Sequence, residues 1–184
     1  GYRNVINEAI RVLRSNIDFM LASQKNQNVI VITSFNPGSG KSFLAMNIAM
    51  SFAIKMKRVL VIDGDLRHGS TSSYVDSPEK GTSDYFSGLT DNWKQLVCHD
   101  ERYLNLHILP IGKVPPNPTE LLENGRLETL IEQVRSEYDY VFIDCPPIDI
   151  VADTQILEKA ADRTIFVIRA GLLDRSMLPE LESI

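Results

Sequence analysis

The sequence predicts an α/β protein with a parallel β-sheet flanked by helices on both faces. Short β-rich runs alternate with helical stretches along the 184 residues, the order that gives a parallel sheet covered by helices. The runs "VIVI", "VLVI" and "TIFVI" are almost continuously apolar, as expected for strands buried on both faces. The length suits one sizeable core, so we expect a single domain over residues 1–184.

The expected elements follow in order along the chain. The predicted strands cover 29–33, 58–63, 104–110, 138–144 and 163–168. The predicted helices cover 4–22, 41–55, a short segment entered from the turn at 115–122, 126–137 and 154–161. A polar stretch after residue 63 runs to about 90. The first helix lies within 1–22, before a core at 28–184, and the chain ends on a further predicted helix without a following strand, which we interpret as a C-terminally truncated sheet edge.

Composition excludes some functions. The net charge of −5 and the pI near 5.2 argue against a general nucleic-acid surface, so we expect no nucleic-acid partner. No run of about 18 apolar residues occurs, so we expect these residues to form a soluble fragment. The two cysteines have no metal-like spacing.

A glycine-rich turn joins the first predicted strand to the next helix. Its glycines let consecutive amides point inward, and the helix N-terminus behind them favours an anion. We expect phosphates to be bound by Pro37, Gly38, Ser39, Gly40, Lys41, Ser42 and Phe43. Lys41 would bridge the β- and γ-phosphates, and Ser42 would offer its hydroxyl to Mg²⁺. The strict phosphate-loop pattern has glycine where this chain has Phe35, and a turn that binds nothing is the alternative.

Carboxylates end two other predicted strands. Asp63 and Asp65 are two residues apart at the end of "VLVID", so in an extended chain they face the same side. Asp144 ends "YVFID", a common source of the carboxylate that holds Mg²⁺. Strand ends of a parallel sheet are where such folds bind ligands, so a phosphate and metal site is expected there, although each carboxylate alone could be a solvated strand end.

These motifs together resemble those of bacterial tyrosine kinases that regulate exopolysaccharide and capsule export. The resemblance covers about residues 8–175, with "TSFNPGSGKS" as Walker A, "VIDGDLR" as Walker A′ and "FIDCPP" as Walker B. The segments "PPNPTELL" and "EAIRVLRSN" also fit the family. The resemblance implies the fold of P-loop ATPases, close to that of partition ATPases.

The resemblance also implies roles for individual residues. Lys41 and Ser42 would hold ATP and Mg²⁺, and Asp144 would complete the metal site. Asp63 would act on the acceptor tyrosine as a general base or through the metal, and Asp65 would support it. The implied activity is ATP-dependent autophosphorylation of a tyrosine-rich C-terminal tail, in trans between the subunits of a ring. No tyrosine cluster occurs near the end of this chain, where relatives have one.

Glu8, Arg11 and Arg14 have the family's Glu-x-x-Arg-x-x-Arg spacing, which implies a contact between ring subunits. A solvated charged face with intrahelical pairing is the alternative. The implied partners are further copies of the chain, a transmembrane activator of the polysaccharide co-polymerase type in the same or a separate chain, and a cognate tyrosine phosphatase. The implied location is the cytoplasmic side of the bacterial inner membrane.

Two other functions fit the same motifs. An ATPase switch of the septum-positioning or partition type shares the fold, but its signature lysine would fall near Asn36, and no lysine occurs in 26–40. A nucleotide-dependent scaffold without catalysis is disfavoured because every carboxylate that catalysis needs is present.

Overall fold

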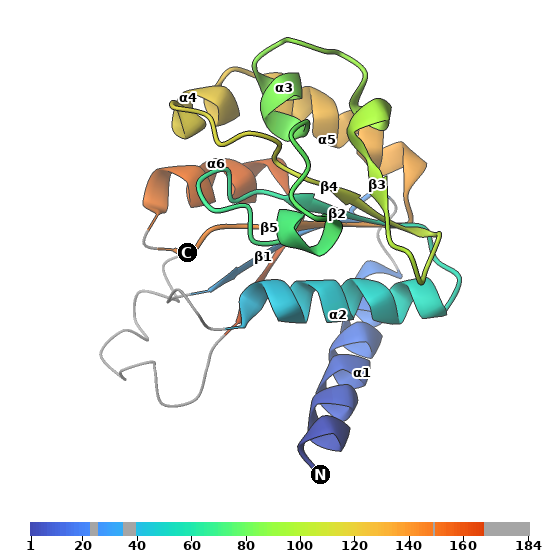
Figure 1. Cartoon of the computed structure of the whole chain (residues 1–184). Coiled ribbons are helices and arrows are strands. Elements are labelled where there is room, and N and C mark those ends of the chain that lie inside the picture. Colours follow the sequence, from blue (N-terminus) through green and yellow to red (C-terminus); the bar gives the residue numbers. More distant parts are fainter. Residues whose placement is uncertain (23–25, 35–39, 149, 168–184) are drawn as a thin grey trace.

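A computed structural model describes residues 1–22, 26–34, 40–148 and 150–167, and it confirms the predicted α/β class (Figure 1). Its sheet has the strand order β3-β4-β2-β5-β1-β6. The strands are β1 (Val29–Ser34), β2 (Val59–Asp63), β3 (Cys98–His99), β4 (Leu106–Leu109), β5 (Tyr140–Asp144) and β6 (Arg163–Val167). All neighbours pair in parallel except β3, which runs antiparallel to β4 at the edge.

Helices cover both faces of the sheet, with α1 and α2 on one face and α3 to α6 on the other (Figure 1). The helices are α1 (Tyr2–Leu21), α2 (Lys41–Ile54), α3 (Thr82–Phe86), α4 (Pro118–Glu123), α5 (Arg126–Glu137) and α6 (Val151–Ala160). Two 3₁₀ turns lie at Ser72–Val75 and Trp93–Leu96. The two-sided cover explains why strands β1 and β2 are buried at every position.

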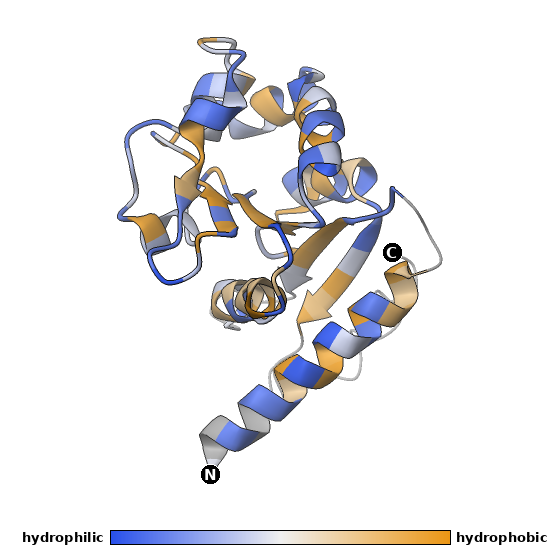
Figure 2. Ribbon diagram, turned by 90° about the vertical axis from the view of Figure 1, so that its right-hand side faces the viewer, coloured by the Kyte–Doolittle hydropathy of each residue, from blue (hydrophilic) through white to orange (hydrophobic). Residues whose placement is uncertain are grey.

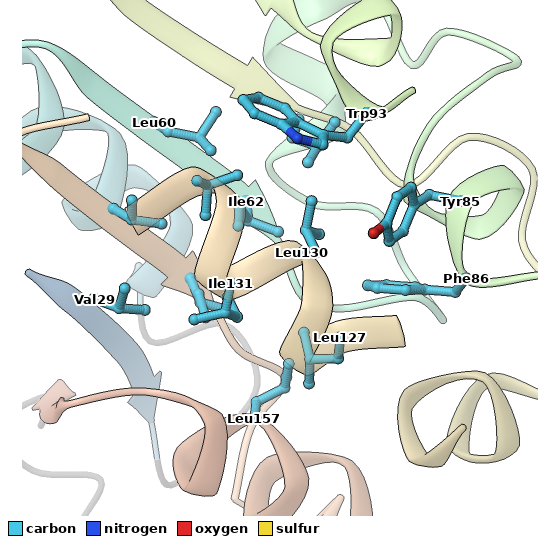
Figure 3. Close-up of a cluster of buried hydrophobic side chains, with 14 of the residues drawn as sticks. Val29, Leu60, Ile62, Tyr85, Phe86, Trp93, Leu127, Leu130, Ile131 and Leu157 are labelled. Atoms are coloured by element: carbon cyan, nitrogen blue, oxygen red, sulfur yellow. The ribbon is translucent and has the colours of Figure 1, made fainter. Parts of the chain in front are cut away.

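Alternate strand residues enter two separate cores. On the face covered by α3 to α6, Leu60 and Ile62 pack with Leu130 and Ile131 of α5 (Figure 3). On the other face, Ile30 and Ile32 of β1 and Val59 and Val61 of β2 pack with α2 and with Ile17 of α1. The central strands are thereby fixed from both sides, which makes their carboxyl ends a firm base for a site.

The structure differs from the sequence prediction mainly between β2 and β4. The polar stretch after residue 63 contains a 3₁₀ turn and α3, and β3 was missed. These elements have two to five residues each, too few for a hydrophobic period to be recognised. Helix α6 begins at Val151 rather than at 154. The helix predicted near the end of the chain falls in 168–184, outside the described residues.

Helix α1 extends away from the sheet and carries a mixture of polar and apolar residues (Figure 2). Ile17 is fully buried against the α2 side, whereas Phe19 is 83% exposed. Among the described helices, none is both long and apolar enough to cross a membrane.

Candidate active site at the carboxyl edge of the sheet

The start of α2 presents backbone amides at the carboxyl edge of the sheet. Gly40 caps the helix in the left-handed region, with φ of 79°, a conformation that glycine adopts without steric cost. The first intrahelical bond runs from Leu44 N to Gly40 O at 2.9 Å. The amides of Lys41, Ser42 and Phe43 therefore belong to the helix end that favours an anion.

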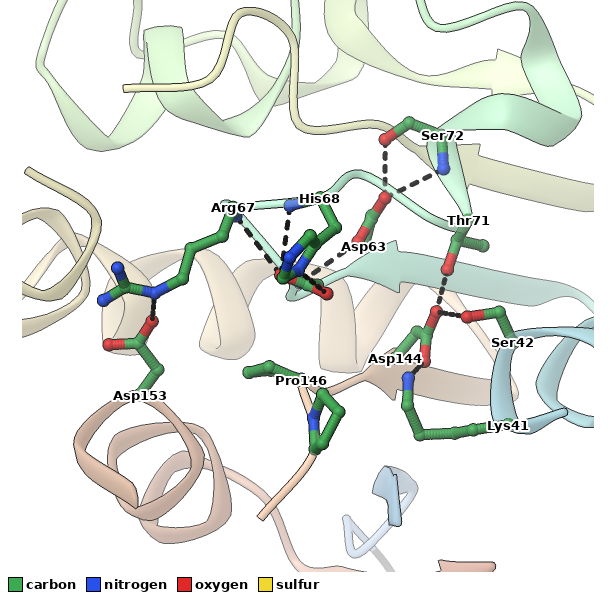
Figure 4. A network of polar contacts seen from close by, with 12 residues as sticks. Lys41, Ser42, Asp63, Arg67, His68, Thr71, Ser72, Asp144, Pro146 and Asp153 are labelled. Atoms are coloured by element: carbon green, nitrogen blue, oxygen red, sulfur yellow. Dashed lines mark hydrogen bonds and ion pairs between the residues drawn. The ribbon is translucent and has the colours of Figure 1, made fainter. Parts of the chain in front are cut away.

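The predicted phosphate-binding residues are only partly described. Pro37, Gly38 and Ser39 lie outside the described residues. The Phe43 side chain is 54% exposed and has no hydrogen-bond donor. Phe43 can therefore offer a phosphate only its backbone amide. The Lys41 side chain is 8% exposed and points into the edge of the sheet (Figure 4).

Asp144, the last residue of β5, contacts three side chains in Figure 4. Its side chain is fully buried and lies in contact with the ammonium group of Lys41. Ser42 Oγ donates to Asp144 Oδ2 at 2.7 Å, and Thr71 Oγ1 donates to the same oxygen. The structure thus brings together Lys41 and Ser42, at the start of α2, with Asp144, at the end of β5, about a hundred residues later in the sequence.

Asp63 lies next to Asp144, because the two residues pair in register where β2 runs beside β5. Its Oδ2 accepts from Ser72 N at 2.8 Å and from Ser72 Oγ at 2.6 Å. Burial raises the pKa of Asp63 to about 7, and the negative charge of Asp144 adds to this, while the Ser72 hydrogen bonds oppose it. Asp63 is a carboxyl group that changes charge near neutral pH.

Asp65 organises the turn that follows β2. The sequence predicted that Asp63 and Asp65 face the same side because it assumed an extended chain through both residues. Strand β2 ends at Asp63, so this assumption does not hold for Asp65. Asp65 accepts from the amides of Arg67 and His68 at 3.2 Å and lies 3.0 Å from His68 Nδ1. Its own amide donates to Asp63 Oδ1 at 3.1 Å. Asp65 therefore supports Asp63 through the backbone of the turn.

Two hydroxyl residues of this site were missed in the sequence. Thr71 and Ser72 fell in the polar stretch after residue 63, yet both are buried and bond the two strand-end carboxylates. Ser72 Oγ also accepts from Ile111 N at 2.9 Å, which ties Asp63 to the chain just beyond β4. The sequence offers one signal for these residues, the run of four hydroxyl residues at 70–73. Thr71 and Ser72 lie eight and nine residues after Asp63, and no local sequence pattern predicts a contact at that separation.

Glu8, Arg11 and Arg14 lie on α1, away from this network. Glu8 and Arg11 form an ion pair on the helix surface, with side chains 60% and 62% exposed. The intrahelical pairing considered as the alternative is therefore present in the isolated chain. A pair this exposed contributes little to folding, which leaves both side chains available to a neighbour.

We expect Gly64→Ala to disturb the spacing of the two carboxylates. Gly64 N donates to Asp144 O at 2.8 Å, and an added Cβ would lie 2.9 Å from that oxygen and 2.9 Å from Ile143 Cγ2. Overpacking of this kind costs about 1–3 kcal/mol, so thermal unfolding of the variant should begin at lower temperature. Gly88→Ala is the control, because φ of +81° strains the alanine while nothing lies within 4 Å. The prediction would be contradicted if Gly64→Ala unfolded at the wild-type temperature, or if the control lost more stability than Gly64→Ala.

The fold and the site together define a class: an α/β protein whose Gly-Lys-Ser helix start meets acidic strand ends binds nucleoside phosphates. Residues 27–176 match the family model described as "AAA domain". The chain is 36% identical over 171 residues to the tyrosine-protein kinase CpsD of Streptococcus agalactiae serotype III (strain NEM316), covering 92% of this chain and 72% of that protein. It belongs to the AAA domain family and, within it, to the bacterial tyrosine-protein kinases.

Other comparisons agree. The chain is 35% identical over 166 residues to the tyrosine-protein kinase etk of Escherichia coli K12, covering 90% of this chain but only 22% of that protein. The solved kinase domain of Escherichia coli ETK superposes with a TM-score of 0.89 at 31% identity, over 96% of this chain and 68% of that one. The septum site-determining protein MinD of Pyrococcus horikoshii, at 22% identity and a TM-score of 0.65 over 76% of this chain and 57% of that one, shares the fold.

Proposed function

We propose that this chain is an ATP-dependent protein-tyrosine kinase domain. The observation that carries the proposal is the convergence of Lys41 and Ser42 on Asp144, with the buried Asp63 directly beside them. The relatives named above are tyrosine-protein kinases. We further propose that residues 1–184 act as one unit, in which the helix within 1–22 serves assembly and the core at 28–184 binds nucleotide.

The residues present fit ATP and Mg²⁺. The amides at the start of α2 and the buried Lys41 suit phosphate oxygens. Ser42, Asp63 and Asp144 offer only oxygen donors, which are the ligands Mg²⁺ prefers. No group of three or more His, Cys, Asp or Glu side chains with metal-binding geometry occurs in the described part of the chain. Mg²⁺ is usually held by one or two carboxylates together with substrate phosphates and water. Bound there, Mg²⁺ would neutralise charge that develops on the transferred phosphoryl group.

The chain's own residues would divide the chemistry among themselves. Lys41 exchanges Asp144 for the β- and γ-phosphates and holds them in line with the acceptor. The phenol oxygen of the acceptor bonds to the γ-phosphorus as the bond from that phosphorus to the bridging oxygen of ADP breaks. Asp63 takes the phenol proton as the general base. Asp65 keeps the turn, and with it Asp63, in place.

The biological setting is proposed from the family resemblance. Autophosphorylation occurs in trans, on a tyrosine-rich tail that is not among these 184 residues, between neighbours in a homo-oligomeric ring. The kinase regulates exopolysaccharide or capsule synthesis and export at the cytoplasmic side of the bacterial inner membrane. A transmembrane activator recruits it there, and a cognate tyrosine phosphatase reverses the modification.

The ring predicts a specific role for the charged residues of α1. We expect the double variant Arg11→Ala/Arg14→Ala to be monomeric by light scattering while its unfolding temperature stays close to that of the wild type. The Glu8–Arg11 pair is exposed, and such pairs contribute at most about 1 kcal/mol to folding. Arg58→Ala is the control, because Arg58, like Arg11, pairs with a carboxylate and has a side chain that is 62% exposed. An unchanged oligomer in the double variant would remove α1 from the interface.

The activity itself is tested by mass spectrometry of the full-length gene product after incubation with Mg-ATP. Phosphotyrosine that is absent from Lys41→Met establishes the kinase and identifies the acceptor positions. Steady release of inorganic phosphate without modified tyrosine, even with the membrane activator added, would instead indicate an ATPase switch of the partition type.

A further inference from the structure

The segment Pro115–Leu122, the "PPNPTELL" motif of the sequence, has no part in the chemistry above. It leads into α4, whose first turn carries Thr119. Thr119 Oγ1 lies 2.5 Å from Asp153 Oδ1 and 3.1 Å from a terminal nitrogen of Arg67. Thr119 therefore reaches two residues on different elements, one of which belongs to the turn after β2.

Arg67 closes this set of contacts into a triangle. Its Nε donates to Asp153 Oδ2 at 3.1 Å (Figure 4), while the terminal nitrogen that reaches Thr119 belongs to the same planar guanidinium group. The Thr119 hydroxyl donates to Asp153 and accepts from Arg67, so it links the two side chains as both donor and acceptor. Each corner of the triangle comes from a different segment: the turn after β2, α4 and α6.

The burial of Asp153 indicates that the triangle does more than stabilise the fold. Asp153 is 1% exposed, and a carboxylate is costly to bury even when it is paired. An apolar side chain at this position would serve packing at least as well. A fixed carboxylate, however, defines the direction and reach of the Arg67 side chain, because a guanidinium binds carboxylates in a fixed planar geometry.

Arg67 is connected to the proposed catalytic carboxylate by a short path. Its backbone amide donates to Asp65 Oδ1 at 3.2 Å, and the amide of Asp65 donates to Asp63 Oδ1 at 3.1 Å. A shift of Arg67 would be passed through the turn to Asp63. The central strands hold the base of Asp63 and Asp144, but the side chain of Asp63 depends on the turn for its Oδ1 partner.

We propose that Arg67, Thr119 and Asp153 are positioning residues for phosphoryl transfer, and that the Pro115–Leu122 segment acts on the reaction by anchoring the turn that aligns Asp63. The proposal rests on the proposed kinase function. None of the three side chains needs to touch ATP or the acceptor. Their loss should therefore lower the rate of the chemical step while nucleotide binding stays intact.

The test measures phosphotyrosine formation by the full-length gene product at varied ATP concentration. Thr119→Val removes the hydroxyl at nearly constant volume, and we expect kcat to fall about tenfold while KM for ATP changes less than about twofold, as loss of a transition-state interaction requires. Thr119→Ser keeps the hydroxyl and should restore kcat. Thr129→Val, at an exposed threonine of α5, is the matched control and should behave as the wild type.

A second comparison examines whether the residues act together. If they form one unit, Arg67→Ala/Thr119→Val should be no slower than Arg67→Ala alone. Additive losses, an unchanged kcat in Thr119→Val, or a rise in KM that accounts for the whole effect would each overturn the proposal. A wild-type protein that forms no phosphotyrosine would instead refute the kinase function. Thr119→Val and Thr119→Ser could also both unfold at a lower temperature, with kcat low in both variants. That outcome would show that the triangle only stabilises the packing.

Discussion

Asp63→Asn should reduce tyrosine phosphorylation by at least about a hundredfold, the typical contribution of a positioned general base. The amide cannot accept the phenol proton, and it leaves the buried surroundings almost unchanged in size. Quantitative mass spectrometry of phosphotyrosine in the full-length gene product, with and without Mg-ATP, measures the effect. Ring assembly should persist, because Asp63 lies at the carboxyl end of the central strand β2 and the proposed contact between subunits lies on α1. Phosphorylation at the wild-type rate would remove Asp63 from the mechanism.

The same variant should be more stable than the wild type when no ligand is bound. The pKa of Asp63 is raised from 3.8 to about 7, so the folded protein retains a proton there that the unfolded chain has lost. The resulting stability is present below about pH 4 and is lost as pH rises through 7, a change of at most about 4 kcal/mol. Asparagine has no charge to acquire, so the variant does not lose this stability as pH rises. Its NH₂ group cannot accept a hydrogen bond in place of one Asp63 oxygen, which offsets part of the gain.

Thermal unfolding at pH 5 and pH 8 tests this sign. We expect Asp63→Asn to exceed the wild type by roughly 3–8 °C at pH 8, on the usual scaling of about 2–4 °C per kcal/mol for this size, and by less at pH 5. Glu128→Gln, on the exposed face of α5, is the control for a removed charge. A difference that is larger at pH 5 than at pH 8 would show that Asp63 is not the group responsible.

Lys41→Met should abolish phosphotyrosine and also destabilise the ligand-free protein. Lys41 is the cation in contact with the fully buried Asp144, and its removal leaves that carboxylate with hydroxyl donors from Ser42 and Thr71. An uncompensated buried charge costs several kcal/mol, and these hydroxyls should limit the loss to about 1–3 kcal/mol. Mass spectrometry and chemical unfolding measure the two effects on the same variant.

Matched variants separate the two effects of Lys41. Lys55→Met, at the exposed C-terminal cap of α2, should leave stability and phosphorylation unchanged. Lys41→Met/Asp144→Asn should recover much of the lost stability and none of the activity, because the buried charge is gone but the phosphate and metal contacts are not restored. Phosphotyrosine at normal levels in Lys41→Met would be incompatible with the proposed phosphate site.

The sequence was sufficient for the parts of the site that strand ends define. Asp63 and Asp144 end apolar runs that are typical of strands buried on both faces, so a shared site at the carboxyl ends of these strands could be predicted from the sequence. Lys41 and Ser42 follow from the Gly-Lys-Ser pattern at a strand-to-helix junction. In both cases a local pattern determines the position of the residue in the fold.

Other parts depend on contacts without a local pattern. Thr71 and Ser72 bond the carboxylates from a 3₁₀ region, and Thr119 and Asp153 meet across 34 residues. The hydrophobic periodicity of the sequence does not predict such contacts, because they arise from the way α4, α6 and the turn after β2 pack together. Asp65 illustrates the same limit, because its role depended on where the strand ended rather than on its spacing from Asp63.

The position of β2 and β5 in the middle of the sheet gives the site two levels of local stability. The backbones of Asp63 and Asp144 belong to one hydrogen-bonded ladder with neighbours on both sides, which opens only when the domain unfolds. The segment 65–72 lies outside the ladder and is held by side-chain contacts and by the bonds from His68 N and Gly69 N to Asp65 O, so we expect it to open at a lower free energy than the strands. Amide hydrogen exchange should therefore be slow in the strands and faster in this segment. Opening of the segment would remove partners of Asp63 while the spacing of the two carboxylates stays constant.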